Sequence, residues 1–344
     1  MPDRAAAPHS SAPHAVPHSV APQAVPHSTA SHGTERNGTG AGLLAVSDLH
    51  ISYRANREIV QALRPESPED WLLVAGDVAE RIEDVRWALG LLAERFARVV
   101  WAPGNHELWT HPSDPVTLRG LARYERLVEV CRSMGVLTPE DPYALFEGRG
   151  GPVRVAPLFV GYDYTFRPPG TSTKEEALAY AHSTGVVCTD EALLHPDPYP
   201  SRDAWCRARL ELTERRLRDC PPGAPLVLVN HYPLVREPTR VLRYPEFAQW
   251  CGTEGTGDWH RRFPVAAVVY GHLHIPRVSW YDGVRFEEVS LGYPREWGKR
   301  DRDRRLLREI LPGVGEGEGS PEGSPEDAPD RSPDGSRGGS AAEG

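Results

Sequence analysis

The sequence predicts a layered α/β domain, in which helices cover the faces of β-sheets. Short apolar runs, many of them β-branched, alternate with longer amphipathic stretches, and this alternation is typical of layered α/β architecture. Each apolar run is also short enough to be one buried strand. The predicted strands are Leu43–Ser47, Trp71–Ala75, Val99–Ala102, Val153–Leu158, Leu226–Val229 and Val265–Tyr270, and the predicted helices are Ile82–Ala97, Val116–Met134 and Asp203–Arg218.

Two later features complete the expected domain. The strands Arg277–Tyr281 and Val284–Val289 flank Asp282-Gly283, a pair that permits the tight turn of a hairpin. Residues 161–202 are rich in Pro, Tyr, Asp and Gly, and we expect an ordered, irregular loop over the site with one short helix near Lys174–His182. One domain spanning residues 42–311 accounts for all these elements.

The two ends of the chain differ from this domain in composition. Residues 1–41 are rich in Ala, Pro, Ser and His, and residues 312–344 are rich in Gly, Ser, Pro and acidic side chains. Neither segment has enough apolar surface to offset the entropy lost on ordering, so both are predicted to be disordered tails. Metal binding by the repeated Pro-His pairs of the first tail remains an alternative.

Composition limits the classes of function. The net charge is −9, and the last 33 residues contribute −6 of it through eight acids and two arginines, so the remainder is nearly balanced. This balance weighs against nucleic acid as a partner. Five cysteines without a C-x-x-C pair indicate reduced thiols rather than disulfides or a zinc ribbon. No apolar run suits a membrane span or a signal peptide, and we therefore expect a cytoplasmic protein.

Polar residues with metal-binding side chains occur where apolar runs end, which is where open α/β sheets place their ligands. The clusters are Ser47-Asp48-Leu49-His50, Gly76-Asp77, Gly104-Asn105-His106-Glu107, Asn230-His231 and Gly271-His272-Leu273-His274. In an extended segment residues i and i+2 point to one side, so Asp48 with His50, and His272 with His274, are expected to face one cavity. The preceding glycines allow close approach of the backbone.

The donors in these clusters suit a pair of metal ions. Carboxylate, amide and imidazole groups without a thiolate form a set suited to Mn, Fe, Zn, Co or Ni. Seven such ligands exceed the needs of one ordinary ion. Two divalent ions sharing a carboxylate fit the number of donors, and such a pair would clamp the attacking and leaving oxygens of a phosphoryl group.

These five blocks, in this order, resemble the calcineurin-like metallophosphoesterase family over roughly residues 43–292. The resemblance implies two facing mixed β-sheets flanked by helices, with the site at the carboxyl ends of strands. It also implies two metal sites that share one bridging carboxylate. The first metal is expected on Asp48, His50 and His274, the second on Asn105, His231 and His272, and the bridge is Asp77.

The family's mechanism implies a role for His106, which is not a metal ligand. A hydroxide activated by the two metals attacks phosphorus, while the imidazole of His106 stabilises or protonates the leaving oxygen as a general acid. Asp77, Asn105 and His106 are therefore the expected catalytic residues. Glu107 is expected either to orient His106 or to cap a helix.

Substrate contacts are expected just after the motifs and in the irregular segment. The strongest candidates are Trp109, Tyr162, Arg167, Tyr293 and Arg295, beside Tyr164, Phe166 and Trp297. Guanidinium groups bind phosphate with two hydrogen bonds, so Arg167 and Arg295 are candidates for a second anionic group. The alternatives are core packing for the aromatic residues and ordinary surface charge for the arginines.

The function predicted is hydrolysis of a phosphomonoester or phosphodiester of a small molecule or nucleotide. The alternatives are a protein phosphatase, a nuclease of the same family, and a metal-binding scaffold without turnover. The sequence carries no signal for membrane association or for an oligomeric state.

Overall fold

The computed structural model describes residues 40–298 and 306–312 of this chain. The predicted tails lie outside the described residues except for positions 40, 41 and 312. The domain boundaries at 42 and 311 therefore stay predictions.

The first sheet carries the three N-terminal strands in parallel. Its order is β10-β1-β2-β3, where β1 is Leu43–Val46, β2 is Trp71–Ala75, β3 is Arg98–Ala102 and β10 is Arg308–Leu311. β10 runs antiparallel to β1. Val46 pairs with Val74, and Ala75 pairs with Ala102, so the carboxyl ends of the three parallel strands are in register at one edge.

The second sheet has the order β4-β5-β6-β7-β9-β8. Its strands are β4 (Ala144–Phe146), β5 (Val153–Pro157), β6 (Leu226–Val229), β7 (Val265–Tyr270), β8 (Arg277–Tyr281) and β9 (Val284–Glu288). β5, β6, β7 and β9 are parallel, and the two outer strands are antiparallel. The predicted hairpin is β8–β9, with Asp282 and Gly283 both at positive φ.

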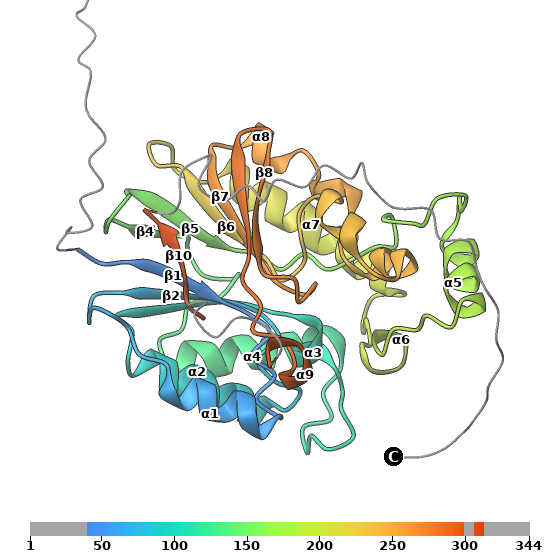
Figure 1. Cartoon of the computed structure of the whole chain (residues 1–344), viewed down its shortest axis with the longest axis horizontal. Coiled ribbons are helices and arrows are strands. Elements are labelled where there is room, and N and C mark those ends of the chain that lie inside the picture. The colour runs from blue at the N-terminus through green and yellow to red at the C-terminus, as the bar shows by residue number, and fades with distance from the viewer. Residues whose placement is uncertain (1–39, 299–305, 313–344) are drawn as a thin grey trace, which may run out of the picture. The chain divides into compact units, whose positions relative to one another are not determined.

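The two sheets pack face to face, and helices cover their outer faces (Figure 1). A buried cluster that includes Leu43, Leu73 and Val100 from the first sheet and Val155 and Val227 from the second fills the space between them. The first sheet's outer face packs on α1 (Arg54–Ala62), α2 (Ile82–Ala93) and α4 (Gly120–Ser133), and the second sheet's on α7 (Arg202–Arg218) and α8 (Trp259–Arg262). The predicted fold class is confirmed.

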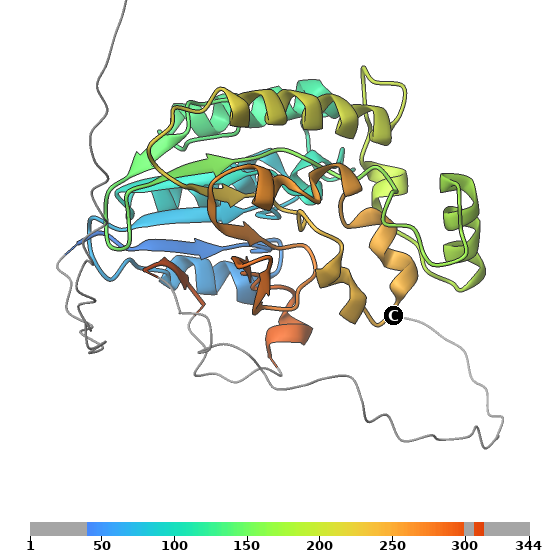
Figure 2. The same ribbon diagram turned by 90° about the horizontal axis from the view of Figure 1, so that it is seen from above.

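The remaining short elements gather at the carboxyl ends of the parallel strands. In Figures 1 and 2, α5 and α6 lie beyond the end to which the β1 arrow points. These elements are α3 (Asn105–Leu108), α5 (Lys174–Ser183), α6 (Asp190–Leu193), α9 (Pro294–Trp297) and the 3-10 helices η1 (Glu237–Val241), η2 (Pro245–Trp250) and η3 (Glu254–Thr256). Residues 161–202 thus contain two helices, where one near Lys174–His182 was expected.

Several predicted boundaries differ from the structure. The helix expected from Val116 begins at Gly120, after a loop fixed by Asp114, whose carboxylate accepts from Ile82 N and from the Arg123 guanidinium. The helix expected to reach Ala97 ends at Ala93. α1, β4 and β10 were not predicted: β4 and β10 are edge strands of three and four residues, and α1 buries only Asn56 and Val60.

Candidate metal centre

The five polar clusters meet at one edge of the two sheets. Asp48 and His50 follow β1, Asp77 follows β2, and Asn105 opens α3 directly after β3. His231 follows β6, and His272 and His274 follow β7. Because β1, β2 and β3 are parallel in one sheet and β6 and β7 in the other, the strand ends of each sheet share one edge, and contacts of His231 with Asn105 and of His274 with Asp48 join the two edges.

The backbone at this edge is left-handed at most of the predicted ligands. Positive φ angles occur at Asp48 (53°), His50 (40°), Asp77 (54°), His272 (69°) and His274 (54°). Elsewhere among the described non-glycine residues only Tyr164 and Asp282 have them. The expectation that each i, i+2 pair converges through extended backbone is therefore wrong. Left-handed residues are strained by about 1–3 kcal/mol each and concentrate at functional sites, where they aim side chains inward.

Two glycines are required by the closeness of the backbone to the carboxylates. A Cβ at Gly104 would lie 2.1 Å from Asp77 Oδ1, and a Cβ at Gly271 would lie 2.2 Å from Asp48 Oδ2. Neither contact is possible for a real side chain. The expected role of glycine before the ligands holds at both positions.

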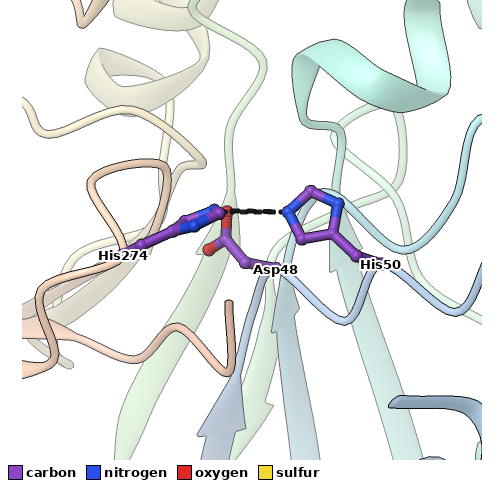
Figure 3. Close-up of side chains that lie close together, drawn as sticks. All are labelled: Asp48, His50 and His274. Carbon is purple, nitrogen blue, oxygen red and sulfur yellow. Dashed lines mark hydrogen bonds and ion pairs between the residues drawn. The ribbon is translucent and has the colours of Figure 1, made fainter. Parts of the chain in front are cut away.

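One group of donors consists of Asp48, His50 and His274, whose side chains point at one another in Figure 3. His274 Nε2 lies 3.0 Å from Asp48 Oδ1 and 3.2 Å from His50 Nε2. His50 Nε2 lies 3.9 Å from Asp48 Oδ1. These residues offer ligand atoms that all lie within 4.8 Å of one another, close enough to hold one metal ion.

A second group consists of Asn105, His231 and His272. His231 Nε2 lies 3.2 Å from Asn105 Oδ1 and 3.2 Å from His272 Nδ1. Asp77 Oδ2 stands between the two groups, 3.4 Å from His231 Nε2 and 3.9 Å from His50 Nε2. Ligands bound at ~2.1 Å to one ion lie ~3.0–3.4 Å apart for octahedral or tetrahedral angles, and most of these separations fit.

The charges of the cluster favour bound cations. Burial alone would raise the pKa values of Asp48 and Asp77, but the surrounding imidazoles hold both below the ordinary range. Burial would lower the pKa of His231, but the adjacent Asp77 carboxylate raises it to about 10. Burial lowers the pKa of His272 to about 3. Two ionised carboxylates in this buried space require positive charge, which the protonated imidazoles of His231 and His274 supply in the metal-free protein and which divalent cations would supply in their place.

Partners behind the donors fix their orientation. His274 Nδ1 lies 2.7 Å from Glu296 Oε2 in α9, and His231 Nδ1 lies 2.9 Å from the carbonyl of Ala75. Ser290 Oγ donates to Asp48 Oδ2 at 2.7 Å. Such partners set the tautomer and the ring plane of metal-binding histidines.

His106 lies at the edge of the cluster with its Nε2 3.7 Å from Asp77 Oδ2. Its Nδ1 lies 2.9 Å from Glu80 Oε1, and its ring packs against Trp109 with 3.7 Å between centroids and 31° between the ring planes. Burial would lower the pKa of His106, but Asp77 and the hydrogen-bonded Glu80 raise it. Glu80 rather than Glu107 therefore orients this imidazole.

Glu107 has the other of its two expected roles. Its buried carboxylate accepts from the backbone N–H of Gly104, Asp77 and Val78, and Glu107 is the third residue of α3, whose N-cap is Gly104. It closes the N-terminus of that helix against the loop after β2. The other expected role, in which Glu107 orients His106, is wrong.

Segment 161–202 reaches the cluster through α6. Asp190 is fully buried, and its Oδ1 accepts from Asn105 Nδ2 at 2.9 Å and from Trp109 Nε1 at 2.6 Å. Burial raises the pKa of this carboxyl group. No sequence signal marked Asp190, which lies 85 residues from Asn105. Glu80, in contrast, follows Asp77 by three residues and could have been found from that spacing.

The predicted substrate contacts divide into two groups. Tyr293 lies in the site, stacked on His50 at 4.5 Å between centroids, and Trp109 packs against His106. The guanidinium of Arg295 lies 5.2 Å from the Tyr293 ring. Tyr162 is buried against Tyr232, whose ring contacts His231 and His272.

The other candidates have contacts with residues other than the donors. Arg167 donates weakly to the carbonyl of Tyr164, at 3.4 Å, and its own carbonyl accepts from Arg236. Tyr164 and Phe166 are buried in the core, and Trp297 Nε1 donates to Asn56. For these residues, contact with substrate stays a prediction.

Comparison with known proteins gives the family. The profile of the calcineurin-like phosphoesterase family matches residues 42–276. The chain belongs to this family. It is accordingly a metal-dependent hydrolase of phosphoester bonds. Among the residues the structure describes, no helix is long and apolar enough to cross a membrane.

A relative in Mycobacterium tuberculosis (strain ATCC 25618 / H37Rv) carries the name acyl-carrier-protein phosphodiesterase PptH. It is 54% identical over 280 residues, which is 81% of this chain and 86% of that protein. The crystal structure of phosphopantetheinyl hydrolase (PptH) from Mycobacterium tuberculosis matches with a TM-score of 0.78 and 54% identity. That match covers 80% of this chain and 98% of the crystallised chain.

Proposed function

We propose that this chain hydrolyses the phosphodiester bond that attaches phosphopantetheine to a carrier protein. The observation that carries the proposal is the 54% identity to PptH over most of both chains, since the names of that protein describe this substrate. Hydrolysis would release phosphopantetheine as a monoester and leave a free hydroxyl group on the carrier protein. A small-molecule or nucleotide substrate stays the alternative expected from the sequence.

We further propose that the seven clustered residues hold two divalent ions, one in each group of donors, with Asp77 between them. The separations of the donor atoms and the two buried carboxylates support this assignment. Mn, Fe, Zn, Co and Ni all suit these ligands. Bound ions would polarise the phosphoryl group and lower the pKa of a water molecule.

The chain's own residues then act on the leaving group. His106 Nδ1 faces Glu80, so the proton of this imidazole that is available to substrate is at Nε2, close to Asp77 Oδ2. From Nε2 the proton would pass to the oxygen of the carrier-protein hydroxyl as the P–O bond breaks. Trp109 keeps the ring in this plane and excludes water from one face.

Exposed residues around the site support a protein-borne substrate. Tyr53 is 48% exposed and contacts Tyr293, which stacks on His50. On the other side Tyr244 is 54% exposed at the start of η2, whose Phe247 stacks on His272. Arg243 lies over the Tyr244 ring. Tyrosine and arginine are enriched where proteins bind proteins.

The test is hydrolysis of a purified holo-carrier protein by the Mn-loaded chain, followed by intact-mass spectrometry. The proposal predicts loss of one phosphopantetheinyl group from the carrier, and no loss with Asp77→Asn. Bis-p-nitrophenyl phosphate and p-nitrophenyl phosphate serve as small diester and monoester substrates. Turnover of the small diester with an unchanged carrier would refute the carrier protein as the substrate, and the chain would still be a phosphodiesterase. Turnover of neither, with two ions bound, would favour the scaffold alternative.

A further inference from the structure

We infer that Asp190, contributed by segment 161–202, is a positioning residue that fixes the side-chain amide of Asn105 for metal binding. The inference rests on the assignment of Asn105 as a ligand in the proposed function. Asp190 is fully buried, and its Oδ1 lies 2.9 Å from Asn105 Nδ2. It belongs to α6, which is far from the motif residues in sequence.

The amide of an asparagine has one donor end and one acceptor end, and only the acceptor end can bind a cation. Because Asp190 Oδ1 accepts from Asn105 Nδ2, the other end of the amide, Oδ1, faces His231 Nε2 at 3.2 Å. The reversed amide would place two oxygens against each other at Asp190. The orientation of Asn105 is therefore set by an acceptor outside the metal cluster.

The same carboxylate oxygen also holds Trp109. Trp109 Nε1 donates to Asp190 Oδ1 at 2.6 Å, and the indole lies on the His106 ring. One buried oxygen thus contacts a proposed ligand of the second metal and the residue packed on the proposed general acid. Through this oxygen, segment 161–202 contributes a structural contact to the centre itself.

The position of Asp190 is fixed from two sides. Its neighbour Glu191, whose side chain is 31% exposed, accepts from Tyr164 Oη at 2.8 Å and from Trp250 Nε1 in η2 at 2.9 Å. At the other end of α6, Thr110 N donates to the carbonyl of Leu193 at 3.0 Å. These contacts hold α6 against the chain that follows Asn105, and Asp190 is thereby kept within hydrogen-bonding distance of Asn105.

The experiment is calorimetric titration of metal-free full-length protein with Mn²⁺, with thermal melting as the check of folding. Asp190→Ala removes the acceptor, and we expect one of two binding events to weaken by about 10–100-fold while the other is retained. Asp190→Asn keeps an acceptor oxygen and should restore most of this affinity. If Asp190→Ala fails to fold, Asp190→Leu, which has a similar shape and no acceptor, takes its place.

Two further variants separate the possible outcomes. Thr184→Ala removes a partly buried hydrogen bond, from Thr184 Oγ1 to the carbonyl of Ala181, in the same segment without removing a contact of α6 or Asn105, and both binding events should be unchanged. Wild-type Mn²⁺ binding by Asp190→Ala, or equal weakening by Thr184→Ala, would overturn the inference. Asn105→Ala must lose the same event as Asp190→Ala. If Asn105→Ala keeps both binding events, the assignment of Asn105 as a ligand fails. If Asn105→Ala loses one event and Asp190→Ala loses none, only the role of Asp190 fails.

Discussion

Replacing Glu80 with glutamine tests whether its carboxylate keeps His106 protonated for its role as a general acid. Glu80 Oε1 lies 2.9 Å from His106 Nδ1, and glutamine keeps the shape and an acceptor oxygen while removing the negative charge. A hydrogen bond to a charged group contributes about 1.5–3 kcal/mol. Since ~1.4 kcal/mol is a factor of ten, kcat/KM for the holo-carrier protein should fall about 10–150-fold.

The same substitution should change the pH dependence in a defined direction. Burial would lower the pKa of His106, but Asp77 and Glu80 together raise it. A general acid must be protonated, so activity is lost as pH rises through its pKa. Removing the charge of Glu80 lowers that pKa, and about 1.5–3 kcal/mol corresponds to roughly 1–2 pH units. The high-pH limb of the rate profile should therefore move to lower pH.

The assay is the initial rate of carrier-protein hydrolysis by Mn-loaded enzyme from neutral to alkaline pH. Glu83→Gln is the matched control, because its side chain is 61% exposed on α2 and should have no effect. His106→Ala should lower the rate by about 10²–10⁴-fold, and adding Glu80→Gln to it should cost nothing more. An equal loss from Glu80→Gln in both backgrounds, or an unmoved high-pH limb, would refute the reasoning.

The remaining predictions concern the metals and the surface. Asp77→Asn should lose both Mn²⁺-binding events in calorimetry, because one carboxylate lies beside both groups; retention of either event would contradict the bridge. Removing the metals with a chelator should lower Tm by about 5–10 °C for each site, relative to protein in free Mn²⁺ at 100 times the Kd of that site. Scanning calorimetry measures Tm, and protein with Mn²⁺ restored is the control. Arg243→Glu should raise KM for an acidic carrier protein by about tenfold without changing turnover of bis-p-nitrophenyl phosphate. Arg218→Glu, at the far end of α7, is the matched charge reversal and should change neither.

Local pattern was sufficient for the elements that are buried on both faces. β2, β6 and β7 have the predicted bounds because a run of apolar residues has no other stable place than the inside of a sheet. The edge strands β4 and β10 were missed because three or four residues are too few to show a periodic pattern. β10 joins β1 across more than 260 residues.

The donor residues were identifiable from sequence, but the way they converge was not. Strand ends predicted a common edge, and the structure brings all seven predicted ligands there. Alternation along an extended chain predicted the wrong backbone for Asp48, His50, His272 and His274. Left-handed conformations at these residues are unfavourable locally and persist because the surrounding fold determines them.

The sequence by itself determined the chemistry: which side chains offer oxygen and nitrogen donors, and in which order along parallel strands. Only the tertiary structure decided which groups stand behind them. Asp190 on Asn105 and Glu296 on His274 come from helices whose sequence carries no common motif, and for Glu80 on His106 only its spacing after Asp77 was a local signal. The reason is physical, because a hydrogen bond requires two atoms about 3 Å apart, and sequence patterns report local periodicity rather than contacts between distant segments.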